Sequence, residues 1–251
     1  MEEIFFKKYG KGKPVIFIHG FCETHEIWNG FVDVFSDHHE VFVIDLPGFG
    51  ASPLPPTPFS IADIASRVLK WMDEKNILRP IVIGHSLGGY VALAMAAIDS
   101  SRISGLGLFH STIFEDSDER KANRMKVIDF VNKHGVDPFI DTFVPGLFYD
   151  KKHSAIPLVD KIARKTPLET LMAYTLAMRN RPSYIDVFKS LKIPVLVLDG
   201  ERDSIIPAEV TEKHRLHNPY AQVIVLPSIG HMAMFESPVP AQKVIAEFIK
   251  A

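Results

Sequence analysis

A serine flanked by glycines lies in Gly84-His85-Ser86-Leu87-Gly88, and it is the side chain best suited to covalent chemistry. The apolar residues Ile81–Ile83 before it predict a buried strand, and Val91–Ala94 after it are typical of a helix. A tight strand-to-helix turn would expose the serine hydroxyl, hold it in a strained backbone conformation and need glycines to avoid Cβ collisions. The helix would direct unpaired N–H groups and its positive end at the turn. This spacing also fits a simple turn of small residues. Other residues must therefore show whether Ser86 is catalytic.

A nucleophilic serine needs a general base and a group that orients the base. Of 11 histidines, His231 is the candidate because it follows the last predicted strand, Gln222–Leu226, in a short loop. Asp203 is the candidate acid, in a loop just after another apolar strand. Asp199 is the alternative, but it ends that strand, whereas Asp203 lies further out in the loop. We therefore predict that Ser86, Asp203 and His231 are catalytic.

Acyl transfer also needs N–H donors for the oxyanion that forms during attack. The backbone N–H of Leu87, directly after the serine, is one expected donor. The other is expected in the loop after the apolar run Pro14–His19, at Phe21. Such donors typically contribute about 3 kcal/mol each to the transition state.

Apolar runs alternate with helix-compatible segments along most of the chain. The runs expected as strands are Ile4–Tyr9, Pro14–His19, Glu40–Asp45, Ile81–Gly84, Ile103–Phe109, Pro194–Asp199 and Gln222–Leu226. This alternation predicts an α/β fold, with a mostly parallel twisted sheet and helices on both faces.

Residues 112–189 interrupt the alternation, because their strand signals stop and helix-compatible patterns take over. An insertion of this size at the carboxyl edge of a sheet is most simply a lid. We therefore expect a core domain of residues 1–111 and 190–251, with residues 112–189 as a helical cap inserted in it.

Composition narrows the function classes. With 28 Lys+Arg and 30 Asp+Glu, the net charge is −2. The chain therefore lacks the excess of positive charge that is typical of proteins that bind nucleic acid or an acidic membrane. Only one cysteine, Cys22, is present, and Met1–Lys8 lacks the basic start of a signal peptide. We expect a cytoplasmic monomer or homodimer whose partner is a small-molecule substrate. We expect no metal and no cofactor, because the predicted chemistry needs neither.

Five segments together resemble the α/β-hydrolase fold family over essentially the whole chain. These segments are His19-Gly20-Phe21, Asp45-Leu46-Pro47-Gly48-Phe49-Gly50-Ala51-Ser52, Gly84-His85-Ser86-Leu87-Gly88-Gly89, Gly200-Glu201-Arg202-Asp203 and Gly230-His231. The resemblance implies a Ser86–His231–Asp203 triad, an oxyanion hole from the Phe21 and Leu87 amides, and a helical cap. The serine argues against haloalkane dehalogenases and epoxide hydrolases, which resemble this family but carry aspartate at the position of Ser86.

We expect a serine hydrolase that acts on a small to medium, largely apolar carboxylic ester. Side chains expected to line the substrate pocket are His110, Phe114, Phe143, Phe148 and Met232. Other activities within the resemblance are carbon–carbon bond hydrolysis, enol-lactone hydrolysis and the elimination catalysed by the menaquinone-pathway synthase. Their substrates carry carboxylates and would need cationic cap residues, for which the candidates are Arg124, Arg164, Arg179 and Arg181. A different class is a small-molecule receptor with vestigial hydrolase activity.

Overall fold

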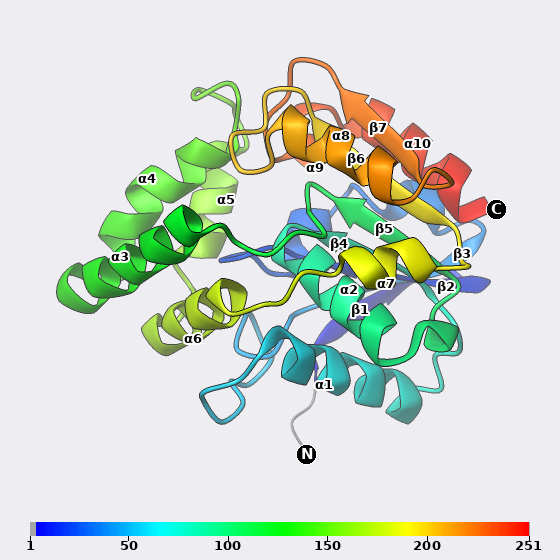
Figure 1. Cartoon of the computed structure of the whole chain (residues 1–251), viewed down its shortest axis with the longest axis horizontal. Coiled ribbons are helices and arrows are strands. Elements are labelled where there is room, and N and C mark those ends of the chain that lie inside the picture. Colours follow the sequence, from blue (N-terminus) through cyan, green and yellow to red (C-terminus); the bar gives the residue numbers. More distant parts are fainter. Residues whose placement is uncertain (1–3, 251) are drawn as a thin grey trace.

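The computed structural model describes residues 4–250, and within them a seven-stranded sheet forms the centre of the molecule (Figure 1). The strands are β1 (Phe6–Tyr9), β2 (Lys13–Ile18), β3 (His39–Ile44), β4 (Ile81–His85), β5 (Gly105–Phe109), β6 (Val195–Gly200) and β7 (Gln222–Leu226). Their spatial order is β1-β3-β2-β4-β5-β6-β7. Only β1 runs antiparallel to its neighbour, so the expectation of a mostly parallel sheet is confirmed.

The central strands are largely apolar because both of their faces are covered. Every residue of β4, β5 and β6 is buried, whereas β1 at the edge is only partly covered. Helices lie on the two sides: α2 passes in front of the sheet and α10 lies behind it (Figure 1). On the α10 side, the Gln242 amide donates to the Phe31 carbonyl at 2.8 Å, which ties this helix to the segment after β2.

The core helices are α1 (Ile61–Glu74), α2 (Leu87–Asp99), α7 (Ile185–Ser190), α8 (Ala208–His217), α9 (Ala233–Glu236) and α10 (Pro238–Lys250). Short 3-10 turns are η1 (His25–Trp28), η2 (Asp33–Phe35) and η3 (Ser100–Arg102). The Ser60–Asp63 pair caps α1 reciprocally. Residues 25–35 form two 3-10 turns and not one helix, with Gly30 between them at a φ of +76°.

Between β5 and β6 the chain forms α3 (Asp118–His134), α4 (Asp137–Leu147), α5 (Ile156–Ala163) and α6 (Leu168–Arg179). We call residues 112–184 the helical insert. Its helices gather on one side of the molecule (Figure 1). Helix α7 packs against α2 and α8 of the core instead, so the insert ends about five residues before the expected boundary. Within residues 4–250, no helix has the length and apolarity needed to cross a membrane.

Candidate active site

Ser86 lies in the turn between β4 and α2, and its backbone is strained. Its φ is 49° and its ψ is −110°, a conformation that non-glycine residues rarely adopt. Two hydrogen bonds hold the turn: the Ser86 N–H donates to the Phe109 carbonyl at 2.9 Å, and the Ser111 hydroxyl donates to the Ser86 carbonyl at 2.8 Å. A Cβ at Gly84 would lie 2.2 Å from the carbonyl carbon of Gly88. The flanking glycines are therefore sterically required, as the sequence predicted.

His231 and Asp203 come together at the carboxyl edge of the sheet. The His231 Nδ1 donates to Asp203 Oδ2 at 2.7 Å, and both side chains are buried. That bond assigns the proton to Nδ1 and leaves Nε2 as the unprotonated, basic nitrogen. His231 and Ser86 line the same pocket. The three residues predicted to be catalytic therefore converge on one site.

Asp203 is bound by donors on both of its oxygens. Oδ1 accepts from the N–H groups of Ile205 and Ile206 at 2.7 and 2.9 Å, and Oδ2 accepts from two histidines, His231 and His110. Burial alone would raise the pKa of this carboxyl, but His231, His110 and their hydrogen bonds hold it well below its usual value. Asp203 is therefore a carboxylate at neutral pH.

Asp199, the alternative acid, has a different role. It is buried and accepts from the Thr211 hydroxyl at 2.7 Å, whereas His231 is bound to Asp203. Burial raises the pKa of Asp199 well above its usual value. The hydrogen bond from Thr211 accounts for an aspartate buried near the end of β6.

His110 is a second histidine that is hydrogen-bonded to Asp203, and it does not line the pocket as expected. Its Nδ1 donates to Asp203 at 2.9 Å, and its Nε2 accepts from the Ala233 N–H at 3.3 Å. These partners require a neutral imidazole, and burial lowers the pKa of His110 to about 4. His110, Asp203 and His231 are also close enough to share a metal ion. Because both Nδ1 atoms already donate to one carboxylate oxygen, hydrogen bonding accounts for this arrangement without a metal.

Of the two expected oxyanion donors, Phe21 lines the pocket, and Leu87 directly follows Ser86, which also lines it. Leu87 is the first residue of α2, where backbone N–H groups have no intrahelical acceptor. Phe21 follows Gly20, whose own N–H donates to Glu23 Oε2 at 2.6 Å. Within residues 4–250, neither the Phe21 nor the Leu87 N–H has a recorded protein acceptor. Both donors are therefore free to bind a ligand oxygen.

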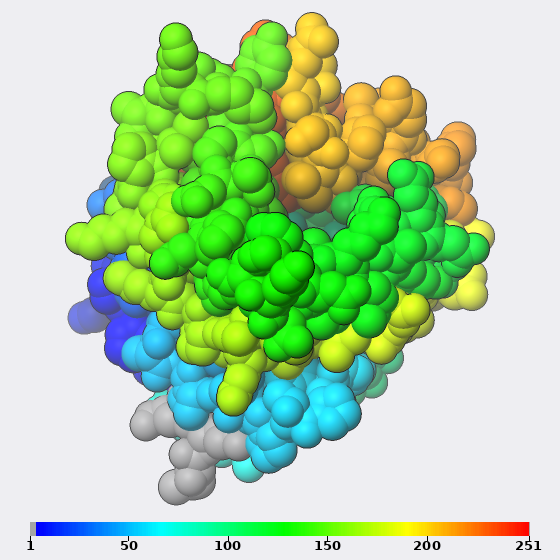
Figure 2. All heavy atoms as spheres, turned by 90° about the vertical axis from the view of Figure 1, so that its left-hand side faces the viewer, coloured from blue at the N-terminus to red at the C-terminus, as the bar shows by residue number. Residues whose placement is uncertain are grey.

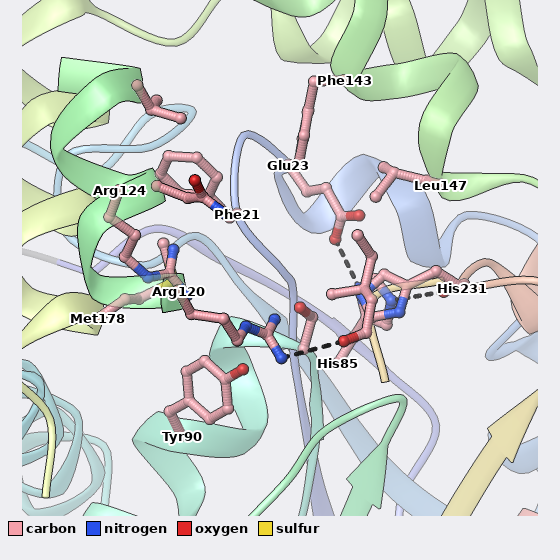
Figure 3. Close-up of a pocket in the computed structure, with 14 residues that line it drawn as sticks. Phe21, Glu23, His85, Tyr90, Arg120, Arg124, Phe143, Leu147, Met178 and His231 are labelled. Carbon is pink, nitrogen blue, oxygen red and sulfur yellow. Dashed lines mark hydrogen bonds and ion pairs between the residues drawn. The ribbon is translucent and has the colours of Figure 1, made fainter. Parts of the chain in front are cut away.

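The pocket is a cavity of about 220 Å³ between the core and the helical insert. Figure 2 shows the corresponding face of the molecule, hollowed between α3 in green and the segment after β6 in yellow-orange. Its lining residues, most of which are labelled in Figure 3, are Phe21, Glu23, His85, Ser86, Tyr90, Arg120, Asn123, Arg124, Val127, Phe143, Leu147, Met178, Ile205 and His231.

Of the five expected pocket side chains, Phe143 alone is among these lining residues. Phe114 borders a separate surface cavity and packs on His214, 5.5 Å between ring centroids. Phe148 is buried against His153, and Met232 is fully buried beneath the His231 loop. His110 is covered by its bonds to Asp203 and Ala233. The expectation failed for Phe114, Phe148 and Met232 because packing uses their apolar surface, and for His110 because its ring is hydrogen-bonded to Asp203 and Ala233.

Sequence reasoning missed Arg120, Asn123 and Val127, which line the pocket beside Arg124. Their positions repeat at i, i+3, i+4 and i+7, the spacing of one helix face, and that signal could have identified them. Of the four cationic candidates, Arg124 is the one that reaches the pocket. Arg181 lies behind it over the Tyr90 ring, and Arg164 is bound at the surface by Asp137, Asp141 and Asp160.

The other two histidines near the site, His19 and His85, are held by structural hydrogen bonds. His19 accepts from the Leu46 N–H at 2.9 Å and contacts the Gly20 carbonyl through its other nitrogen. His85 lies between Glu23 and the backbone carbonyl of His231, 2.9 Å from each (Figure 3). It links the loop of the expected oxyanion donor to the loop of the base.

A family model described as the alpha/beta hydrolase fold matches residues 13–238, and the chain therefore belongs to that family. It is 30% identical to a thermophilic esterase from Thermogutta terrifontis, solved with malate bound, with a TM-score of 0.92. That alignment covers 98% of this chain and 93% of the esterase. The family predicted from the five segments is thus confirmed.

Two curated relatives carry different names. Lipase 3 of Moraxella sp. is 27% identical over 90% of this chain and 74% of the lipase. The dihydrolipoyllysine-residue acetyltransferase component of the acetoin cleaving system of Pseudomonas putida is 26% identical over 95% of this chain. This chain spans 64% of the length of that component. Family membership therefore supports a hydrolase without naming its substrate.

Proposed function

We propose that this protein is a serine hydrolase that cleaves a small to medium, largely apolar carboxylic ester through an acyl-enzyme on Ser86. The observation that carries the proposal is the 2.7 Å hydrogen bond from His231 Nδ1 to Asp203, in a pocket that His231 shares with Ser86. This bond prepares a base, and the strained turn presents a nucleophile to the same cavity. The names of the esterase and lipase relatives agree with this chemistry.

In the first half-reaction, Ser86 Oγ attacks the ester carbonyl carbon while His231 Nε2 takes the hydroxyl proton. Asp203 stabilises the imidazolium, and the Phe21 and Leu87 N–H groups bind the oxyanion. Collapse of the tetrahedral intermediate breaks the C–O bond to the alcohol, which leaves with the proton from His231. Water then attacks the acyl-enzyme, again with His231 as base, and releases the carboxylic acid and free Ser86.

The pocket walls indicate the kind of acyl group. Its apolar side chains come from the core and the insert, among them Phe21, Phe143, Leu147 and Met178. A cavity of about 220 Å³ suits a small or medium substrate and excludes a polymer backbone. We expect chain-length selectivity to follow from these walls.

The test is the initial rate of hydrolysis of p-nitrophenyl acetate, butyrate, hexanoate and octanoate by wild type and by Ser86→Ala. We expect wild-type turnover with an optimum at intermediate length, and background rates for folded Ser86→Ala. Turnover that survives in Ser86→Ala would assign the reaction to another group. Absence of turnover from folded wild-type protein that binds small molecules tightly would favour a receptor.

A further inference from the structure

We propose that the pocket contains a subsite for a carboxylate, formed by Arg120 and Arg124 of α3. This inference rests on the proposed function, and it specifies the substrate: an ester whose acyl or alcohol part bears a negative charge. Figure 3 shows both guanidinium groups extending from α3 into the pocket, while Glu23, His85 and His231 lie across from them. The reacting groups and the cations thus occupy different sides of one cavity.

Positive charge exceeds negative charge in the cluster that Arg120 and Arg124 form with Asp116 and Arg181. Arg124 binds Asp116 through Nε, Arg181 Nη1 lies 2.8 Å from the same carboxylate, and Arg120 Nε lies 3.7 Å from it. Asp116 is buried, and the guanidinium groups keep the pKa of its carboxyl below the usual value although burial opposes this. Three guanidinium charges against one carboxylate leave two positive charges uncompensated among these four residues.

Arg181 supports the other two and does not reach the pocket itself. It is buried, stacks 3.9 Å from the centre of the Tyr90 ring, and donates to the carbonyls of Met178 and Phe114. Arg181 and Arg124 both bind Asp116, so the single negative charge of this carboxylate is shared between guanidinium groups. Arg120 and Arg124 are therefore left in need of another anion.

Both pocket arginines retain unused hydrogen-bond donors. A guanidinium group has five N–H donors in a planar fork that matches a carboxylate. The recorded hydrogen bonds within residues 4–250 use one donor of Arg120, to the Ile205 carbonyl at 3.2 Å, and the Nε of Arg124. The side chains are 37% and 18% exposed, so they are partly desolvated and still accessible to a ligand. Partial desolvation strengthens their attraction for an anion.

No other described residue lining the pocket supplies the missing negative charge. Glu23 is the one acidic side chain in the lining, and its carboxylate is bound by His85 and by the Gly20 N–H. Asn123 and Tyr90 add neutral polar groups on the arginine side. A carboxylate on the substrate would complete the charge balance of the cavity.

The hydrolytic test compares an anionic ester with a neutral ester that has the same acyl chain length. On the acyl side, the p-nitrophenyl monoester of adipic acid is paired with p-nitrophenyl hexanoate. On the alcohol side, the hexanoate ester of 4-nitrophenol is paired with that of 5-hydroxy-2-nitrobenzoic acid. The readout is the ratio of kcat/KM for the anionic ester to kcat/KM for the neutral one. We expect a ratio above one in at least one pair, and a fall in it of about 10- to 100-fold in Arg120→Gln, the range for a charge-assisted hydrogen bond.

Two further variants separate charge recognition from structural damage. Arg120→Lys keeps a positive charge and should retain part of the preference. Arg164→Gln removes an insert arginine that is bound at the surface by aspartates and does not line the pocket, so the ratio should stay unchanged. If the ratio of kcat/KM values is the same in wild type and Arg120→Gln for both ester pairs, the subsite proposal is overturned.

A binding measurement keeps the inference testable if no ester is hydrolysed. Monomethyl adipate is titrated calorimetrically into Ser86→Ala and into Ser86→Ala/Arg120→Gln. Binding that is about tenfold weaker or more in the double variant, and weaker at high salt, would support the subsite even if the hydrolase proposal fails. Equal affinity in the two proteins would overturn the subsite whatever the hydrolytic result.

Discussion

Glu23 and His85 form a buried ion pair, with Glu23 Oε2 2.9 Å from His85 Nδ1. The other imidazole nitrogen lies 2.9 Å from the His231 carbonyl, so both nitrogens face acceptors and both must carry a proton. Burial lowers the pKa of His85, but the charge and hydrogen bond of Glu23 outweigh it and raise the pKa above the usual value. The pKa of Glu23 is lowered in turn, against the effect of burial, chiefly by His85.

Removing one member of this pair should destabilise the protein strongly. His85→Gln leaves the Glu23 carboxylate buried without its cation, which typically costs about 3–5 kcal/mol. Glu23→Gln/His85→Gln removes both charges and should cost less than the single change. Urea unfolding of wild type, Glu23→Gln, His85→Gln and the double variant at pH 6 measures this, and additive effects of the two single substitutions would contradict the ion pair.

The contribution of the pair should also depend on pH. The depressed pKa of Glu23 gives stability that is present above its unfolded value, 4.5, and is lost as the pH falls further. The raised pKa of His85 gives stability that is full below its unfolded value, 6.5, and is lost as the pH rises toward the folded value. The wild-type advantage over the double variant should therefore be greatest between pH 4.5 and 6.5 and smaller at pH 9. A difference that grows above pH 6.5 would mean that His85 is neutral.

Asp203 and Asp199 provide a matched pair of aspartate substitutions. Asp203→Asn should lower kcat by about 10⁴-fold, because the amide no longer fixes the His231 tautomer. Asp199→Asn should change kcat only a few-fold, since Asp199 bonds Thr211 whereas His231 bonds Asp203. Steady-state kinetics on one ester decides between them, and the reverse ranking would show that the acid is misassigned.

His110 should act as a positioning residue through its hydrogen bond to Asp203. His110→Ala removes that bond and should lower kcat by about tenfold or more with little change in KM. His110→Asn keeps an N–H donor and suits the positive φ of 51° at this position, so it should recover part of the rate. Thermal unfolding is recorded for both variants. If both are equally slow while Asn restores stability, His110 contributes to packing alone.

The fold and the reacting groups were predictable because local sequence determines them. Buried parallel strands read as apolar runs, and the turn at Ser86 needs glycines at fixed offsets for reasons of local geometry. Asp203 and His231 each follow a strand, and the carboxyl ends of parallel strands lie at one edge of the sheet. Their positions in the sequence therefore predicted that they lie close together.

The pocket could not be predicted from sequence to the same degree, because its walls depend on how α3 and α4 lie on the core. Phe148 and Phe143 look alike in sequence, yet one packs on His153 and the other lines the cavity. Arginine positions show the same limit: Arg124 and Arg164 both bind aspartates, but of these two only Arg124 lines the pocket. The partners of His110 and His85 come from loops distant in sequence, and no local pattern indicates them.

The most direct measurement is the detection of the acyl-enzyme on Ser86. Wild-type protein is mixed rapidly with excess p-nitrophenyl hexanoate, nitrophenol release is followed, and the quenched protein is digested for mass spectrometry. We predict a burst of nitrophenol no larger than one equivalent of enzyme and a hexanoyl group on the peptide that contains Ser86, both absent in Ser86→Ala. Hydrolysis by wild type with the acyl group on another residue, or an undiminished rate in Ser86→Ala, would contradict the proposed mechanism.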